Sequence, residues 1–170
     1  MIRVVVDDLA FLPTDAIVRP ATAELEPTTA ALRRVEQMGG PEFQQRIHVN
    51  RPLVVGAAVV TAAGGELPAE FVIHAVIQSR DEAISRSGVA RAWRSALERA
   101  REWGFARITV PPLGIGAGNL TLEAAAQVLV QELTDPTSPP PPAEVTIVVE
   151  TDEQREIFQA QLQRAQARLS

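Results

Sequence analysis

The stretch from Pro111 to Thr121 has the residue pattern with the most specific chemistry. Three glycines, Gly114, Gly116 and Gly118, fall within five residues between a predicted strand and a predicted helix. Glycines let the backbone turn tightly and direct successive N–H groups at one point, and the N-terminus of the following helix adds a partial positive charge. Such a loop can bind an anion without a cationic side chain. A plain tight turn is the alternative, and the glycines alone do not choose between the two.

Two familiar phosphate-binding motifs do not explain this loop. The Rossmann fingerprint needs a third glycine where Asn119 stands, and the P-loop ends in Gly-Lys followed by Ser or Thr. The chain contains no Lys, and its sixteen basic residues are all Arg. An anion bound by this loop would therefore require the geometry of another fold.

The absent residue types exclude several kinds of chemistry. Without Cys there is no thiolate nucleophile, disulfide or sulfur-bound zinc, and without Lys there is no Schiff base. The two His residues, His48 and His74, lack the spacing of a helical metal site, so we expect no metal and no cofactor. A net charge of −5, with Arg interspersed among Glu, argues against binding to duplex nucleic acid.

The hydropathy pattern predicts a protein that does not enter a membrane. The longest apolar runs, such as Pro52 to Ala63, are too short to span a bilayer. The first residues enter a strand-like run without a charged and then apolar leader. We therefore expect a cytoplasmic protein.

Two further groups could contribute to a site. Asp7 and Asp8 directly follow a predicted strand, and a carboxylate there can accept a hydrogen bond from an exocyclic amine such as that of adenine. A solvated turn is the more common role of such a pair. His74 lies in the middle of a predicted strand with Val72 and Val76 on its face, which favours a core or supporting role.

Alternating strand and helix patterns would position these groups. Strands are predicted at Ile2–Val6, Ala16–Arg19, Val54–Ala62, Phe71–Ile77, Arg107–Val110 and Glu144–Glu150. Helices are predicted at Thr28–Met38, Pro41–Ile47, Ser87–Trp103, Thr121–Leu133 and Asp152–Ala167. The order predicts one α/β domain over residues 1–170, a three-layer α/β/α sandwich with a mixed, mostly parallel central sheet.

Taken in order, these segments resemble the macro domain family. Each motif is common by itself, and their order along nearly the whole chain makes the resemblance specific. The matching segments are Asp7-Asp8-Leu9, Asp15 to Thr22, Gly40 to Phe43, Val55 to Thr61, Leu67 to Val76 and Pro112 to Leu120.

The resemblance implies recognition of ADP-ribose, free or attached to protein. Asp8 matches the acidic residue that holds the adenine amine, and Leu9 matches the neighbour beside the base. Ala21 and Thr22 match the end of an Asn-Ala-Ala-Asn segment beside the distal ribose. The matches to the diphosphate-binding loop are Gly114, Ile115, Gly116, Ala117, Gly118 and Asn119.

The departures from the family pattern fall on the ribose side. Thr22 replaces the last Asn of that segment, Arg19 replaces the first, and Glu26 to Leu32 replaces a Gly-rich run with the Asp of hydrolytic members. The resemblance therefore implies a binding module for ADP-ribose or a related adenosine diphosphate, with no residue assigned to catalysis. Arg19 could clamp a phosphate bidentately or point to solvent from an edge strand.

Two alternatives stay open. The chain could hydrolyse ADP-ribose conjugates, such as ADP-ribosyl esters or ADP-ribose 1″-phosphate, with Arg19, Thr22, Thr28 and Thr29 around the ribose. It could also be a degenerate macro fold that binds no nucleotide, in which case side chains should fill the cleft between Thr22 and Gly114.

Overall fold

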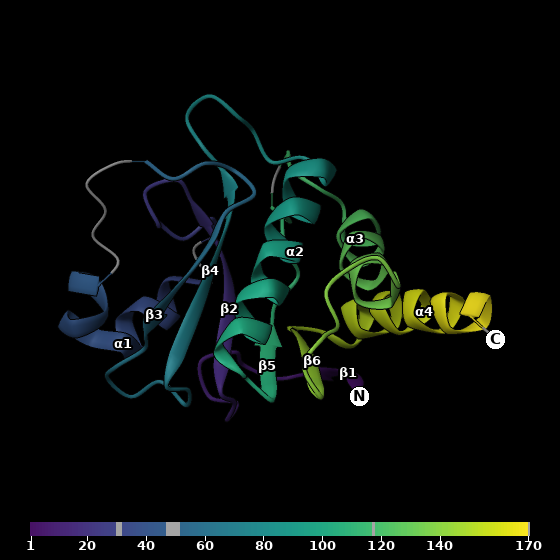
Figure 1. The fold of residues 1–170 in the computed structure, drawn as a ribbon, viewed down its shortest axis with the longest axis horizontal. Helices are drawn as coiled ribbons and strands as arrows, with labels where there is room; N and C mark the ends of the chain where they lie inside the picture. The colour runs from purple at the N-terminus through teal and green to yellow at the C-terminus, as the bar shows by residue number, and fades with distance from the viewer. Residues whose placement is uncertain (30–31, 47–51, 117, 170) are drawn as a thin grey trace.

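The computed structural model describes residues 1–29, 32–46, 52–116 and 118–169, and these form a six-stranded sheet between layers of helices (Figure 1). The strands are β1 (Ile2–Val6), β2 (Ala16–Thr22), β3 (Ala58–Ala62), β4 (Phe71–Gln78), β5 (Arg107–Val110) and β6 (Glu144–Val149). The helices are α1 (Arg33–Arg46), α2 (Arg86–Trp103), α3 (Leu122–Thr134) and α4 (Asp152–Leu169).

The strand order across the sheet is β1-β6-β5-β2-β4-β3. Neighbouring strands pair in parallel, except that β3 runs antiparallel to β4 at one edge. Parallel strands place their carboxyl ends at the same edge of the sheet. The segments that follow β1, β6, β5 and β2 therefore meet along one edge, which is where ligands bind in open α/β sheets.

Helices cover both faces of this sheet. Figure 1 shows α2, α3 and α4 on one side and α1 on the other. The larger apolar core lies under α2, α3 and α4, where Trp93 is fully buried and its indole Nε1 donates to the carbonyl oxygen of Leu129 at 3.1 Å. On the other face, Val35 and Phe43 of α1 pack against the sheet. The predicted three-layer sandwich with a mixed, mostly parallel sheet is confirmed.

Three predicted boundaries are wrong. β2 continues past Arg19 to Thr22, because Pro20 and Ala21 still pair with Ala75 and Val76 of β4. β3 begins at Ala58 instead of Val54, because Gly56 has a φ of 99° and turns the chain just before the strand. α1 begins at Arg33 instead of Thr28, so Thr28 and Thr29 precede the helix. The predicted stop before Pro41 is confirmed as a kink at Gly40, which has a φ of 68°.

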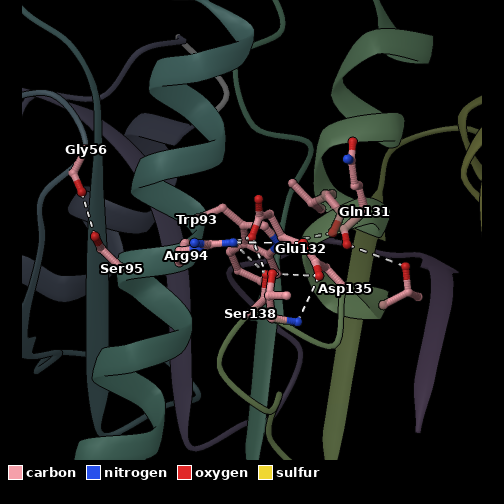
Figure 2. A network of polar contacts seen from close by, with 11 residues as sticks. Gly56, Trp93, Arg94, Ser95, Gln131, Glu132, Asp135 and Ser138 are labelled. Atoms are coloured by element: carbon pink, nitrogen blue, oxygen red, sulfur yellow. Dashed lines mark hydrogen bonds and ion pairs between the residues drawn. The ribbon is translucent and has the colours of Figure 1, made fainter.

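The loop from Asp135 to Pro142, which is rich in proline, follows α3. A network of polar contacts holds this loop against α2. Figure 2 shows the Arg94 side chain of α2 reaching toward Glu132, Asp135 and Ser138. Its Nε donates to Glu132 Oε2 at 3.1 Å, and its Nη2 donates to Ser138 Oγ at 3.2 Å. Ser138 Oγ in turn donates to Glu132 Oε2 at 2.6 Å. This network ties helix to loop on the face opposite α1.

The helices of the described part of the chain are all too short or too polar to cross a bilayer.

Candidate functional site

A cavity of about 440 Å³ runs along the shared edge of the sheet, over the carboxyl ends of β1, β6, β5 and β2. A volume of this size is typical of sites for small ligands. The lining residues come from β2, β6, the loops after these four strands and the first turns of α1 and α4. They are Asp7, Asp8, Leu9, Ala10, Pro20, Thr28, Thr29, Leu32, Arg34, Val35, Pro111, Pro112, Gly114, Ile115, Val148, Glu150 and Gln154.

One end of the cavity, next to β1 and β6, is acidic. Asp7, Asp8 and Glu150 line it together with Arg34, the one cation among the lining residues that the structure describes. Asp8 Oδ1 accepts a hydrogen bond from the backbone N–H of Ala10 at 2.9 Å, and its other oxygen forms an ion pair with Arg34 Nη1. This end of the cavity therefore favours a neutral group with N–H donors over an anion.

The loop after β5 forms the middle of the cavity. Gly114 has a φ of 86°, and a Cβ there would lie 2.9 Å from Val89 Cγ2 and 3.0 Å from Leu120 Cδ1, so this position requires glycine. The carbonyl oxygen of Gly114 accepts from the N–H of Leu120 at 3.0 Å, which closes the loop on itself. Thr121 then caps α3, with its hydroxyl oxygen accepting from the N–H of Ala124.

The opposite end of the cavity, beyond β2, is lined by Pro20, Thr28 and Thr29. A Cβ placed on Gly116 would lie 4.0 Å from Thr29 Cγ2, so the Gly-rich loop and the Thr28–Thr29 segment face each other closely. Among the described lining residues, this end has hydroxyl groups but no titratable side chain. The four charged side chains of the described lining gather at the acidic end.

The sequence-predicted site residues divide into two groups. Asp8, Leu9, Gly114 and Ile115 line the cavity. The other predicted residues are absent from the described lining: Ala21, Thr22, Gly116, Gly118 and Asn119. Ala117, also predicted, lies outside the described residues.

Local contacts explain where Ala21 and Thr22 lie. Ala21 is fully buried in an apolar cluster with Phe43, Val72 and Val76. Thr22 Oγ1 accepts from the N–H of Glu26 at 3.1 Å and so closes a turn. Neither side chain extends into the cavity wall.

Sequence reasoning missed Arg34, Glu150 and Gln154. Glu150 directly follows β6 as Asp7 follows β1, so its position at a strand end was a usable signal. The N–H of Glu150 donates to Gln154 Oε1 at 2.9 Å, which brings the first turn of α4 to the cavity. Arg34 had no comparable signal, because its contact with Asp8 joins segments 26 residues apart.

The structure corrects both interpretations of Arg19. β2 is an internal strand of the sheet, and the Arg19 side chain is fully buried, so it does not point to solvent from an edge. Its three nitrogens also have protein partners instead of facing a phosphate. Nε donates to His74 Nδ1 at 2.8 Å, Nη1 pairs with Glu36 Oε1 at 3.0 Å, and Nη2 donates to the carbonyl oxygen of Leu25 at 2.5 Å.

His74 is the buried supporting residue that its strand position predicted, with a hydroxyl partner that the sequence did not reveal. Its Nε2 lies 2.7 Å from Thr61 Oγ1 on β3. Burial, and secondly the charge of Arg19, hold the pKa of His74 well below its usual range. The ring is therefore neutral at pH 7. Because Nδ1 accepts from Arg19, the proton is on Nε2, which donates to Thr61.

This neutral histidine makes the protein less stable in acid. Below pH 6.5 the imidazole takes up a proton in the unfolded chain but not in the folded one, so the free energy of unfolding falls as the pH falls. Between pH 7.5 and pH 5.0 we expect His74 to contribute about 2 kcal/mol of this loss. Urea unfolding at both values should show a smaller loss for His74→Gln, whose amide can replace both hydrogen bonds. Equal losses in the two proteins would mean that His74 is protonated in the folded state.

Comparisons with known proteins agree with this architecture. The family model for the Macro domain matches residues 18–129 of this chain. An uncharacterized protein of Aquifex aeolicus is 31% identical over 154 residues, which cover 90% of this chain and 92% of that protein. An uncharacterized protein of Mycobacterium tuberculosis is also 31% identical, but the match covers 72% of this chain and only 34% of that protein.

Solved structures have the same fold. The Oceanobacillus iheyensis macrodomain with ADP superposes with a TM-score of 0.83 at 22% identity, covering 97% of this chain and 91% of that one. A variant of the same macrodomain with ADPR gives a TM-score of 0.80 at 22% identity, covering 96% and 92% of the two chains. The matched sequence pattern spans more than half of the chain, and the sheet and the cleft at its edge agree with it, so the protein belongs to the macro domain family.

Proposed function

We propose that this chain binds ADP-ribose or a related adenosine diphosphate ligand, free or attached to protein, in the cavity at the carboxyl edge of its sheet. The main support is the order of chemical groups along that cavity. An acidic end with Asp8 adjoins a Gly-rich loop, and hydroxyl groups line the far end. Two structural neighbours, described with ADP and with ADPR, have the same fold.

The sheet order orients such a ligand. Four neighbouring strands, β1, β6, β5 and β2, span about 14 Å at their usual spacing. An extended nucleotide diphosphate can lie across them, with the adenine amine donating to Asp8 and the diphosphate facing the N–H groups of the loop after β5. The distal ribose would then lie against Thr28 and Thr29. The carboxylates of Asp7, Asp8 and Glu150 oppose the reverse orientation, because they would repel the phosphates.

The two alternatives have less support. Hydrolysis would need a general base or a positioned water at the distal ribose, and the described lining there offers Thr28 and Thr29 but no carboxylate or imidazole. A degenerate scaffold would have its cleft filled with side chains, whereas a cavity of about 440 Å³ is present beside Gly114. Binding without efficient catalysis is therefore the better account.

Calorimetric titration with ADP-ribose, ADP and AMP tests this proposal. We expect affinity to rise in the order AMP, ADP, ADP-ribose, because each ligand reaches further along the cavity. Failure to bind any of the three at millimolar concentration would show the proposal to be wrong. Incubation with mono-ADP-ribosylated protein should release little free ADP-ribose, and rapid release would favour the hydrolase instead.

Asp8→Ala should weaken adenine nucleotide binding and remove selectivity for the base. The expected loss for ADP is about 1.5–3 kcal/mol, the usual range for a hydrogen bond to a charged group. IDP has a carbonyl oxygen where ADP has its amine, so the wild type should prefer ADP over IDP and Asp8→Ala should not. Glu82→Ala is the matched control, because Glu82 also pairs with an exposed arginine, Arg91, but does not line the cavity. A preference for ADP that survives in Asp8→Ala would mean that another group holds the base.

A further inference from the structure

We propose that Arg19 is a positioning residue that fixes the distal wall of the cavity and thereby selects ligands that have a ribose beyond the diphosphate. This inference rests on the proposed function. It assigns Arg19 no contact with the ligand, because its guanidinium is fully buried and occupied by protein partners.

One partner of Arg19 lies in the turn before the distal wall, and another lies on α1, which lines the adjoining part of the cavity. Glu36 lies on α1, whose first turns contribute Arg34 and Val35 to the cavity. Leu25 lies in the turn that leads to Thr28 and Thr29. One buried side chain on a central strand therefore holds both segments in place.

The turn at Leu25 needs a contact such as the hydrogen bond from Arg19 to keep its conformation. Leu25 is the one non-glycine residue with a positive φ, 63°, in the described part of the chain. A branched side chain in this conformation costs free energy, and it persists only where surrounding contacts hold it. The N–H of Leu25 donates to the carbonyl oxygen of Thr22 at 2.8 Å, and its own carbonyl oxygen accepts from Arg19. Without the guanidinium, this strained turn loses the contact on its buried side.

The histidine behind Arg19 fixes the direction of the guanidinium. Nε of Arg19 donates to His74 Nδ1, and the ring is held from its other side by Thr61. The Phe43 ring lies 5.5 Å from the guanidinium carbon. With contacts on these sides, the two terminal nitrogens point at Glu36 and Leu25.

The other half of the cavity meets the partners of Arg19 at α1, where the exposed Arg34 pairs with Asp8, and an exposed ion pair of this kind contributes little. Asp8 and Gly114 follow β1 and β5, and their backbone contacts are with Ala10 and Leu120. Loss of Arg19 should therefore weaken contacts with the distal ribose and leave the adenine and diphosphate contacts in place. A purely stabilising role predicts instead that the folded protein binds ADP and ADP-ribose in the wild-type ratio.

The test is calorimetric titration of ADP and ADP-ribose with the wild type, Arg19→Met and the double variant Arg19→Met/Glu36→Leu. Arg19→Met leaves the carboxylate of Glu36 without its partner, and this variant could fail to fold for that reason. The double variant removes both charges of the pair, so it replaces Arg19→Met in that case. Arg94→Met is the matched control, since Arg94 also joins a helix to a loop (Figure 2) but does not line the cavity. We expect the advantage of ADP-ribose over ADP to fall at least tenfold in both Arg19 variants and to persist in Arg94→Met.

A second measurement needs no ligand. Amide hydrogen exchange at Leu25 and Glu26, whose N–H groups bond within the turn, should become faster in the Arg19 variants and stay unchanged in Arg94→Met. A wild type that binds no nucleotide overturns the proposed function, and the exchange rates then decide whether Arg19 holds the wall. If the wild type binds both ligands, an unchanged ligand ratio in the Arg19 variants overturns the role in ligand selection, and unchanged exchange rates overturn the positioning of the turn in every case.

Discussion

Gly116→Val should lower the affinity for ADP-ribose at least roughly 100-fold, or about 2.7 kcal/mol, while the chain still folds. The backbone at Gly116 has a φ of 138°, which a valine adopts only with strain. Its Cβ would lie 3.1 Å from Asn119 Nδ2 and 4.0 Å from Thr29 Cγ2. The two methyl groups would occupy the gap between the Gly-rich loop and the Thr28–Thr29 segment, where the proposed site places the diphosphate against the backbone. Calorimetric titration combined with thermal unfolding measures both effects.

The control for this variant separates strain from obstruction. Gly104→Val introduces the same residue at a φ of 70°, with no atom within 4 Å of its Cβ, at the C-terminal cap of α2. Both substitutions should destabilise the fold, by on the order of 1–3 kcal/mol, but Gly104→Val should keep wild-type affinity. If Gly116→Val binds ADP-ribose as the wild type does, the loop after β5 is not the diphosphate-binding loop.

Glu36→Leu should lower the free energy of unfolding by about 3 kcal/mol. It leaves the fully buried guanidinium of Arg19 without its carboxylate, and an unpaired buried charge is among the costliest defects in a protein. Burial already lowers the pKa of Arg19 to about 10, while Glu36 opposes this shift. Urea or thermal unfolding at pH 7.5 measures the loss.

The double variant Arg19→Met/Glu36→Leu provides the internal comparison. Replacing both partners with apolar side chains removes the buried charge, so it should recover most of the stability lost in Glu36→Leu. We expect this partial recovery together with the changed ligand ratio described above. If the double variant is no more stable than Glu36→Leu, the loss comes from the packing of α1 and not from the unpaired charge.

The sequence contained enough information to predict the edge of the sheet where the cavity lies. Asp8 and Gly114 each follow a strand pattern, and strand ends gather at one edge in a parallel sheet. Both residues line the cavity because this geometry depends only on local patterns and topology. Glu150 follows the same rule, and its omission was avoidable.

The contacts of Arg19 could not be predicted in this way. Its partners His74 and Glu36 lie 55 and 17 residues away, and nothing in the local pattern distinguishes a buried arginine from a surface one. Ala21 and Thr22 lie at the end of β2, where the chain enters an irregular segment, and alignment to a family motif did not show where their side chains point. Side-chain direction in such a segment depends on its turn, here closed by Thr22 and Glu26.

The hydrogen bonds from Arg19 through His74 to Thr61 also constrain how related sequences can vary. A guanidinium only donates, so an arginine at position 19 requires an acceptor at position 74, and the neutral ring then requires an acceptor at position 61. An asparagine at position 19 would impose no such direction, because its amide both donates and accepts. Homologues with arginine at position 19 should therefore retain the hydroxyl at position 61 on β3 and the carboxylate at position 36 on α1. Positions 19, 36, 61 and 74 should change together in evolution.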